Sequence, residues 1–301
     1  MTSPEISVVI TTYNRPERIK DAIETVLNQT FKDIEIIVVD GANSRKNRLA
    51  VRRVKYNGNK LKYKNIKYVR VEPEAVNYIS YKGIQHSRNV GCKVAKGKYI
   101  AMLDDDDKWE KNKLEEQYNI FKYGVCGWAK DEIGLVLCAT KINMGDKIVV
   151  DRTKRTPNYE DLLQSYNLSS TSTYLIRRDI LEEVGFWNEK LRGMHEYDIA
   201  LKLSKLGYKI YALQEPLMYR DRISNITVES GHYYFFKIAE IFDLWHYYGK
   251  DFLPNVGIKG FLFNTIKTVV LISLFSFGYI IKERVWNFVY PLKKLHEEVV
   301  E

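Results

Sequence analysis

The stretch that decides the fold is Tyr99-Ile100-Ala101-Met102-Leu103-Asp104-Asp105-Asp106-Asp107. Its apolar part predicts a buried strand, and its four aspartates concentrate negative charge at the end of that strand. Like charges a few ångströms apart repel one another, and a divalent cation with oxygen ligands removes that repulsion. A bare run of aspartates is equally typical of a solvated acidic loop, but Trp109 and the helical segment after it favour a site for Mg²⁺ or Mn²⁺.

Two further apolar runs, residues 6–12 and 34–40, predict parallel strands with a helix between them. Pro16 suits the first turn of that helix, and apolar side chains then recur at helical spacing. A strand, a helix and a second strand in close succession form a βαβ unit. Because ligands of such sheets bind beyond the carboxyl ends of the strands, we expect segment 11–15, Asp40 and the aspartate run to share one edge.

These blocks resemble glycosyltransferase family 2. The family usually has T-x-Y-N-R, A-R-N-x-G and L-D-x-D-D, which correspond to Thr11–Arg15, Ser87–Gly91 and Leu103–Asp107. The family also has V-V-D-D-G-S after its second strand, and this chain has one aspartate fewer in Val38–Ser44. The resemblance covers roughly residues 5–225. It implies an α/β fold of the GT-A type, with a Rossmann-like, mostly parallel central sheet flanked by helices.

The resemblance also implies a chemistry, which is metal-dependent, inverting transfer of a sugar from a nucleoside-diphosphate sugar to an acceptor hydroxyl. UDP and GDP are the leading nucleotides. The metal, Mg²⁺ or Mn²⁺, is assigned to Asp106 and Asp104 of the D-x-D motif. Arg222 stands where the family has a histidine, and since arginine cannot ligate a metal, it would grip diphosphate oxygens instead. The residues predicted to bind the nucleotide-sugar are Thr11, Tyr13, Arg15, Asp40, Arg88, Asp104, Asp105 and Arg222.

The general base of the family lies in an E-D-x-D motif, for which this chain has His195-Glu196-Tyr197-Asp198. Glu196 would share a helix face with apolar residues and point towards packed structure, so we predict Glu196 as the base. Asp198 is the second catalytic candidate, although its spacing from Lys202 is typical of a surface ion pair. His195 either orients an acceptor or only begins the helix.

The middle of the chain predicts further elements. Segment 141–172 reads as polar and irregular, apart from one short helix. A helix beginning at Arg178 is expected to end at Gly185. Strands are predicted over residues 134–140, 172–177, 208–213 and 217–220, and short helices over 159–166 and 178–186.

Length and composition fit one core domain and an extension. The chain has 301 residues, 45% of them hydrophobic. We predict a catalytic domain over 1–230, divided into a nucleotide-binding half (1–107) and an acceptor half (108–230), and a helical extension over 231–301. Three cysteines without metal or redox spacing, and a polar start without a signal peptide, favour a cytoplasmic protein.

The net charge of +9 is concentrated in residues 41–70, which contain eleven Lys or Arg and no acidic residue. This basic segment is either a solvated helix face or a surface for anionic lipid headgroups or a phosphate-bearing acceptor. No nucleic-acid motif accompanies it, so nucleic acid is not a predicted partner.

The C-terminal part contains fourteen uncharged residues, 268–281, which are fewer than the ~20 needed to span a bilayer. Basic and aromatic flanks extend this segment to 258–286 and favour a helix lying in the membrane interface. The alternative is packing on the catalytic domain or on a second subunit, as in a homodimer. We therefore expect a peripheral protein at the cytoplasmic membrane face, acting on a saccharide or lipid-linked acceptor.

Two rival functions use similar residues. A nucleotidyltransferase would show a Gly-rich, basic phosphate loop after the first strand, which residues 12–15 lack. A non-catalytic nucleotide- or sugar-binding module is favoured by the altered motif at 195–196 and disfavoured by the intact aspartate run.

Overall fold

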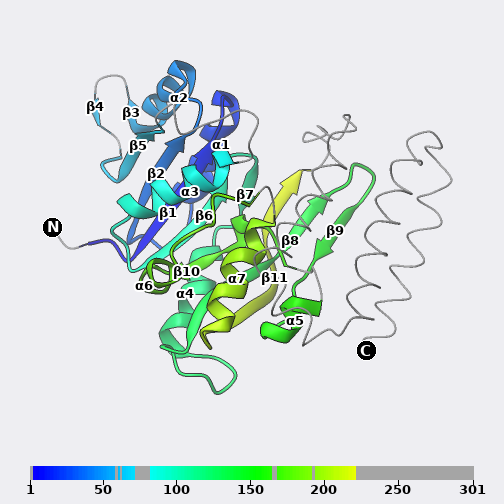
Figure 1. The fold of residues 1–301 in the computed structure, drawn as a ribbon. Helices are drawn as coiled ribbons and strands as arrows, with labels where there is room; N and C mark the ends of the chain where they lie inside the picture. The colour runs from blue at the N-terminus through cyan, green and yellow to red at the C-terminus, as the bar shows by residue number, and fades with distance from the viewer. Residues whose placement is uncertain are drawn as a thin grey trace. The chain divides into compact units, whose positions relative to one another are not determined.

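The structure, a computed structural model, describes residues 3–57, 60–61, 63–71, 82–164, 168–191 and 194–221 (Figure 1). The chain divides into two units, Met1–Ile226 and Thr227–Glu301, and every described residue belongs to the first. The predicted extension, including 258–286, therefore lies outside the described residues, and so does Arg222. Within the described ranges, no helix is long and apolar enough to cross a membrane.

The centre of the first unit is a mixed sheet. In the described part of the chain, nine strands join in the order β5-β2-β1-β6-β10-β8-β11-β7, with β9 beside β8 (Figure 1). The strands are β1 (Ile6–Thr12), β2 (Ile34–Asp40), β5 (Ile66–Arg70), β6 (Tyr99–Asp104), β7 (Asp107–Trp109), β8 (Ile133–Asn143), β9 (Ile148–Asp151), β10 (Leu175–Arg177) and β11 (Lys209–Asp221). A separate hairpin joins β3 (Tyr56–Asn57) and β4 (Lys60–Leu61).

The sheet has a parallel first half and a mixed second half. Strands β5, β2, β1 and β6 are parallel, as their apolar sequences predict, and each residue of β1 and β2 is buried. Strand β10 is antiparallel to both β6 and β8, whereas β11 is parallel to β8. The predicted α/β class with a helix-flanked central sheet is confirmed.

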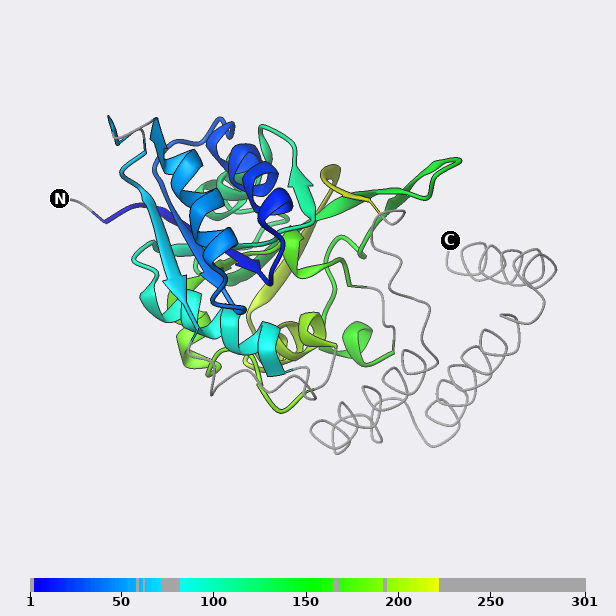
Figure 2. The same ribbon diagram turned by 90° about the horizontal axis from the view of Figure 1, so that it is seen from above.

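Helices cover both faces of the parallel half. Alternate residues of β1 point to opposite faces, so Val8 and Ile10 pack in one core with Ile19 and Ile23 of α1. Val9 points to the other face, towards Gly91 of α3. Figure 2 shows helices on the two sides of the sheet. The helices are α1 (Pro16–Leu27), α2 (Arg45–Lys55), α3 (Lys82–Val94), α4 (Lys113–Tyr123), α5 (Tyr159–Gln164), α6 (Arg178–Glu183) and α7 (His195–Lys205), and a 3₁₀ turn, η2, spans Thr171–Thr173.

Helix α3 packs directly against the sheet at Gly91. A Cβ atom at Gly91 would lie 2.4 Å from Val9 Cγ1 and 2.9 Å from Val39 Cγ2, both too short for real contacts. The missing side chain therefore sets the distance between α3 and the β1–β2 pair. Arg88, one turn earlier on α3, is thereby held near the end of β6.

Three expectations about elements need correction. Residues 171–173 form the 3₁₀ turn η2 instead of strand, since the Thr173 amide bonds to the Ser170 carbonyl at 2.9 Å, and the strand covers only 175–177. Segment 141–172 is not irregular throughout, because β8 continues to Asn143 and pairs with β9. The strands expected at 208–213 and 217–220 are one strand, β11, with register shifts around Pro216.

Candidate functional site

Three strand ends meet at one edge of the sheet, as predicted. In the parallel register, Thr12 lies opposite Asp40 and Thr11 lies opposite Asp104. The hydroxyl of Thr11 donates to Asp104 Oδ1 at 3.0 Å, and that of Thr12 donates to Asp105 Oδ2 at 2.7 Å. The first strand therefore orients the first two carboxylates of the aspartate run.

The aspartate run is not a patch of bare negative charge, because each carboxylate has a cationic partner. Arg88 Nη2 bonds to both oxygens of Asp104, at 3.0 and 3.1 Å. Arg15 Nη1 lies 3.2 Å from Asp105 Oδ1 and 3.0 Å from Asp106 Oδ2. Arg220 binds Asp107 through two bonds, at 3.0 and 2.8 Å. The repulsion expected from the sequence is thus largely neutralised by arginines.

The electrostatics differ between neighbouring aspartates. Burial raises the pKa of Asp104, but Arg88 and Arg220 outweigh burial and hold that pKa below its ordinary value. For Asp105 burial prevails over the Thr12 hydrogen bond and the Arg15 charge, and raises the pKa to about 6. Asp104 is therefore the more firmly ionised of the two.

Arg88 is a buried cation with unused hydrogen-bonding capacity. Its side chain is 2% exposed, and its Nε and Nη1 have no hydrogen-bond partner among the described residues. Buried N–H donors without partners are costly, and a bound anion would satisfy them. This fits the predicted contact of Arg88 with the donor, which stays a prediction.

A short turn joins the aspartate run to α7. Ser172 of η2 accepts a hydrogen bond from the Asp104 amide at 3.0 Å through its Oγ. The preceding residue, Thr171, donates through its hydroxyl to Glu196 Oε1 at 3.0 Å. Two adjacent residues of one turn thus contact the backbone amide of the predicted metal-binding Asp104 and the carboxylate of the predicted general base.

Glu196 lies half-buried at the start of α7 with its charge stabilised. Burial raises the pKa of Glu196, but His195, Arg88 and the Thr171 hydrogen bond outweigh burial and leave that pKa below its ordinary value. Glu196 is therefore ionised at neutral pH and able to accept a proton. His195 is buried beside Gln85, with its Nδ1 2.6 Å from the Gln85 side-chain nitrogen.

Asp198 has different surroundings. The expected pair with Lys202 forms at 3.0 Å, but the description of a surface pair is wrong, because the Asp198 side chain is 0% exposed. The same carboxylate oxygen also accepts from the Asn188 amide at 2.8 Å. Asp198 therefore ties α7 to the segment before it.

Asp40 points into the protein and organises the turn that follows β2. Its carboxylate is fully buried and accepts from the amides of Ala42 (3.0 Å) and Ser44 (2.7 Å), from Asn47 Nδ2 (3.0 Å) and from the Tyr68 hydroxyl (2.5 Å). This bonding fixes the start of α2. Direct contact of Asp40 with the nucleotide base stays a prediction.

Tyr13 is the exposed aromatic of this edge. Its side chain is 42% exposed, and a Cβ added to Gly41 would lie 3.4 Å from the Tyr13 ring. Contact of Tyr13 with the nucleotide-sugar stays a prediction.

Among the described residues, no group of three or more His, Cys, Asp or Glu side chains converges as a metal site. The chemistry of the aspartate run still fits a hard cation, since Asp104 and Asp106 offer carboxylate oxygens and are 21% and 18% exposed. Two carboxylates leave most of the coordination sphere to substrate and water, as is usual for Mg²⁺.

Sequence reasoning assigned no role to five polar residues of this edge. Arg18 lies 3.7 Å from Asp106, and Arg220 also bonds to the Ser170 hydroxyl. The hydroxyl-rich run at 169–173 could have indicated the turn, but nothing local to it names its partners on β6 and α7. The missed residues are Arg18, Ser170, Thr171, Ser172 and Arg220.

Comparisons with known proteins give a family. Residues 7–185 match the model of the family described as Glycosyl transferase family 2. A relative from Escherichia coli, UDP-Glc:alpha-D-GlcNAc-diphosphoundecaprenol beta-1,3-glucosyltransferase WfaP, is 33% identical over 117 residues, which are 39% of this chain and 41% of that protein.

Solved structures share the fold. S. aureus TarS 1-349 in complex with UDP matches with a TM-score of 0.56 and 20% identity, over 80% of this chain and 65% of that chain. Mannosyltransferase PcManGT from Pyrobaculum calidifontis, in complex with GDP-Man and Mn2+, matches with a TM-score of 0.54 and 18% identity, over 91% of this chain and 71% of that chain. At these identities the likeness establishes the GT-A fold.

Proposed function

Because the chain belongs to glycosyltransferase family 2, we propose that it transfers a sugar, with inversion and with the help of a divalent cation, from a nucleoside-diphosphate sugar to an acceptor hydroxyl. One observation carries the proposal, namely the η2 turn, which connects the backbone of Asp104 at the end of β6 to the carboxylate of Glu196. Donor-binding and proton-accepting groups are thereby joined by one short segment.

The donor side uses the edge of the parallel half. The base lies near Thr11, Tyr13 and the Asp40 turn, and the ribose hydroxyls bond to Asp104 or Asp105. The buried charge and unpartnered donors of Arg88 support a contact with the diphosphate. Arg15, which is 47% exposed, can turn from the aspartates to a phosphate oxygen. UDP and GDP are the candidate nucleotides, as bound by TarS and PcManGT.

Asp106 and Asp104 would hold Mg²⁺ or Mn²⁺, in line with the Mn2+ of PcManGT. When bound, this cation supplies positive charge where negative charge develops on the departing diphosphate. The aspartates that would hold it keep their arginine partners nearby, so Arg15 and Arg88 would add to that neutralisation.

On the acceptor side, Glu196 takes the proton of the acceptor hydroxyl. The hydroxyl oxygen bonds to the anomeric carbon from the face opposite the nucleotide, while the bond between that carbon and the phosphate oxygen breaks. Its electron pair leaves with the nucleoside diphosphate, and the configuration inverts. The lowered pKa of Glu196 supports its being ionised for this step.

A saccharide is the expected acceptor, and a lipid-linked one is supported by the diphosphoundecaprenol acceptor in the name of WfaP. This would suit a cytoplasmic protein lying peripherally at the membrane.

The proposal is tested by release of free nucleoside diphosphate from a panel of UDP- and GDP-sugars. We expect release from one donor, loss on chelation and recovery on adding Mg²⁺ or Mn²⁺. Asp106→Ala should lower the rate at least ~100-fold, since charge stabilisation at a leaving group is worth several kcal/mol. Asp146→Ala, an exposed loop aspartate, is the matched control and should keep the wild-type rate.

Full activity of Asp106→Ala would sink the metal assignment. A folded protein that binds a donor but releases no nucleotide, with or without acceptor extract, would instead favour the binding module.

A further inference from the structure

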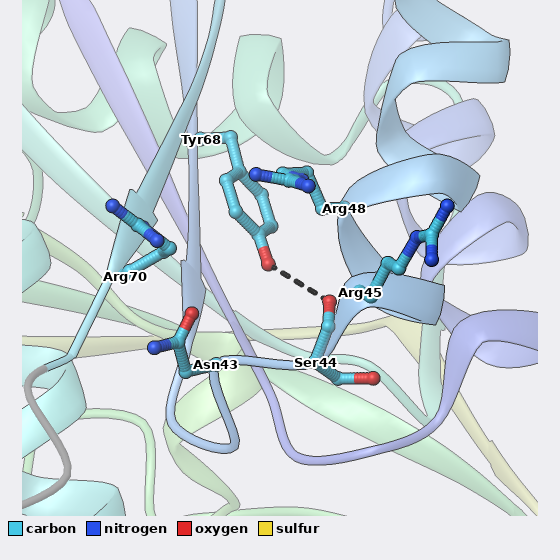
Figure 3. A pocket seen from close by; sticks show the side chains of 6 residues that line it. All are labelled: Asn43, Ser44, Arg45, Arg48, Tyr68 and Arg70. Atoms are coloured by element: carbon cyan, nitrogen blue, oxygen red, sulfur yellow. Dashed lines mark hydrogen bonds between the residues drawn. The ribbon is translucent and has the colours of Figure 1, made fainter.

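A polar pocket lies between the start of α2 and the end of β5 (Figure 3). It has a volume of about 150 Å³. Tyr68 stands in its middle, with Arg70 of β5 on one side and the α2 side chains on the other. The lining residues are Asn43, Ser44, Arg45, Arg48, Tyr68 and Arg70.

The arginines of this pocket differ from those of the aspartate edge. Arg15, Arg88 and Arg220 are each paired with an aspartate. Within the described ranges, Arg45, Arg48 and Arg70 have no carboxylate partner, and segment 41–70 contains no acidic residue that could supply one. Among the described residues, these three guanidinium groups around one hollow thus lack a directly paired carboxylate, a role that a bound anion would fill.

Two further polar groups at the pocket, the Ser44 amide and the Tyr68 hydroxyl, are already committed. The Ser44 amide bonds to Asp40, and the Asn47 amide bonds to Ser44 Oγ at 3.5 Å, so free amides at the start of α2 do not make the site. The Tyr68 hydroxyl donates to Asp40 at 2.5 Å. Burial and Asp40 raise the pKa of Tyr68, although Arg48 and Arg70 act in the opposite direction from close by. The charge that would recognise an anion therefore comes from the arginine side chains.

We propose that this pocket binds a phosphate oxyanion at a site separate from that of the donor diphosphate. Guanidinium groups match phosphate oxygens in geometry and charge, and here they come from two elements that a single phosphate can bridge. At roughly 30 Å³ per water in the liquid, the hollow has room for a phosphate group. The phosphate belongs either to a phosphorylated solute or to the headgroup of an anionic phospholipid, since both present the same oxygens.

The pocket is connected to the donor edge by one side chain. Tyr68 lines the pocket and bonds to Asp40, and Asp40 holds the turn whose Gly41 lies beside Tyr13. A phosphate held by Arg48 and Arg70 would therefore influence the position of this turn, which lies next to the expected position of the nucleotide base.

The test titrates inorganic phosphate into the full chain at constant ionic strength, without donor, and follows the arginine Nε–H and Gly41 amide NMR signals. We expect saturable shifts in the wild type and affinity at least ~10-fold weaker in Arg48→Gln/Arg70→Gln, because charge-assisted hydrogen bonds are lost. Lys46→Gln/Arg53→Gln is the matched control, with the same charge change on exposed α2 positions outside the pocket. It should bind as the wild type does.

A second arm measures sedimentation with vesicles of phosphatidylglycerol or phosphatidylcholine. Saturable binding of inorganic phosphate that is lost only in Arg48→Gln/Arg70→Gln, the pocket variant, identifies a phosphorylated solute as the ligand. Selective loss of phosphatidylglycerol binding in the pocket variant alone identifies a headgroup. The proposal that the pocket binds phosphate would be overturned by either of two results. One is equally weakened binding by both double variants in both arms, and the other is no binding of phosphate or phosphatidylglycerol by the wild type. Neither arm uses a sugar donor, so the result is independent of the proposed transfer reaction.

Discussion

Glu196 and Asp198 are two residues apart on α7, and their surroundings differ. Glu196 meets the hydroxyl of Thr171 on the turn that also holds Asp104, whereas Asp198 is buried against Lys202 and the Asn188 amide. We expect Glu196→Gln to lower kcat by about 10²–10⁴-fold and to leave the donor Kd unchanged, since a general base contributes that much. Stopped assays of sugar transfer and donor titrations measure the two quantities.

Asp198→Asn is the comparison variant on the same helix. It removes the charge of a buried pair and should lower the free energy of unfolding by about 1–3 kcal/mol, with most of kcat retained where the protein is folded. Denaturant unfolding and activity at low temperature separate the two effects. If Asp198→Asn were folded but inactive while Glu196→Gln stayed active, Asp198 would be the general base and Glu196 the structural residue.

At this scale the sequence could predict the place of the aspartate run at a strand end but not its partners. Four aspartates after an apolar run indicate a charged strand end in any parallel sheet. The cations that pair with them lie far along the chain, as with Arg220 and Asp107 at a separation of 113 residues. Only the folded sheet brings such residues together, so local spacing contains no signal for them.

Among the elements, α3 depends on one missing side chain. Gly91→Ala would put a methyl group 2.4 Å from Val9 Cγ1, so α3 or β1 must shift. We expect a loss of about 1–3 kcal/mol in the free energy of unfolding, as overpacked cores show, and weaker donor binding because Arg88 moves with the helix. Val94→Ala, at the 40% exposed end of α3, should change neither. Urea unfolding and donor titration of both variants provide the check.

At the opposite ends of the parallel strands, the buried carboxylate of Glu35 binds groups from three segments of the chain. Glu35 of β2 accepts from the Ser7 hydroxyl and the Lys96 amide, both at 2.7 Å, and pairs with Lys67 of β5. Burial raises the pKa of Glu35, but Lys67 and these hydrogen bonds outweigh burial and leave it below the ordinary 4.5. A lowered folded-state pKa means that this stabilisation is present above the unfolded pKa and is lost as the pH falls through the folded one.

We therefore expect Glu35→Gln to cost about 1–2 kcal/mol of unfolding free energy at pH 7 and progressively less as the pH falls below 4.5. Unfolding curves across that range measure the difference. If the loss of unfolding free energy in Glu35→Gln stayed constant from neutral to acid pH, the ionised Glu35 carboxylate would not be its cause. Glu24→Gln, on the exposed side of α1, serves as the control.

Apolar runs in the sequence predicted the strands that are buried on both faces. They did not predict the elements that are partly exposed or shaped by local hydrogen bonds. Strands β1, β2 and β6 were predicted within a residue because burial demands continuous apolar sequence. Strand β9 was missed because its residues are half-buried or exposed, and η2 was taken for strand because Ser170 diverts the backbone through local hydrogen bonds. Such local competition leaves little trace in hydrophobic periodicity.

For the whole molecule, the described strands and helices end with β11 at Asp221, and the domain end near residue 230 stays a prediction. We expect residues 1–230 to unfold cooperatively and to release nucleotide from the donor as the full chain does, because every described contact of the site lies within them. Circular dichroism melts and the donor assay test this.

The same fragment tests the expected membrane segment. Loss of vesicle binding on removing 231–301 would assign membrane contact to 258–286, whereas vesicle binding retained by residues 1–230 would assign it to the basic segment 41–70. A fragment that fails to fold would show that the extension belongs to the catalytic domain.

The η2 turn has a consequence for the order of events. Ser172 is fixed to the strand end that is expected to receive the donor, and its neighbour Thr171 is fixed to the base. An adjustment of Asp104 on donor entry is thus passed to Glu196 through a single peptide link. We expect sequential initial-rate kinetics in which the nucleotide-sugar is the leading substrate and product nucleotide competes with it alone. Initial-rate kinetics that fit a random order of substrate binding would mean that the η2 turn deforms without moving the general base, Glu196.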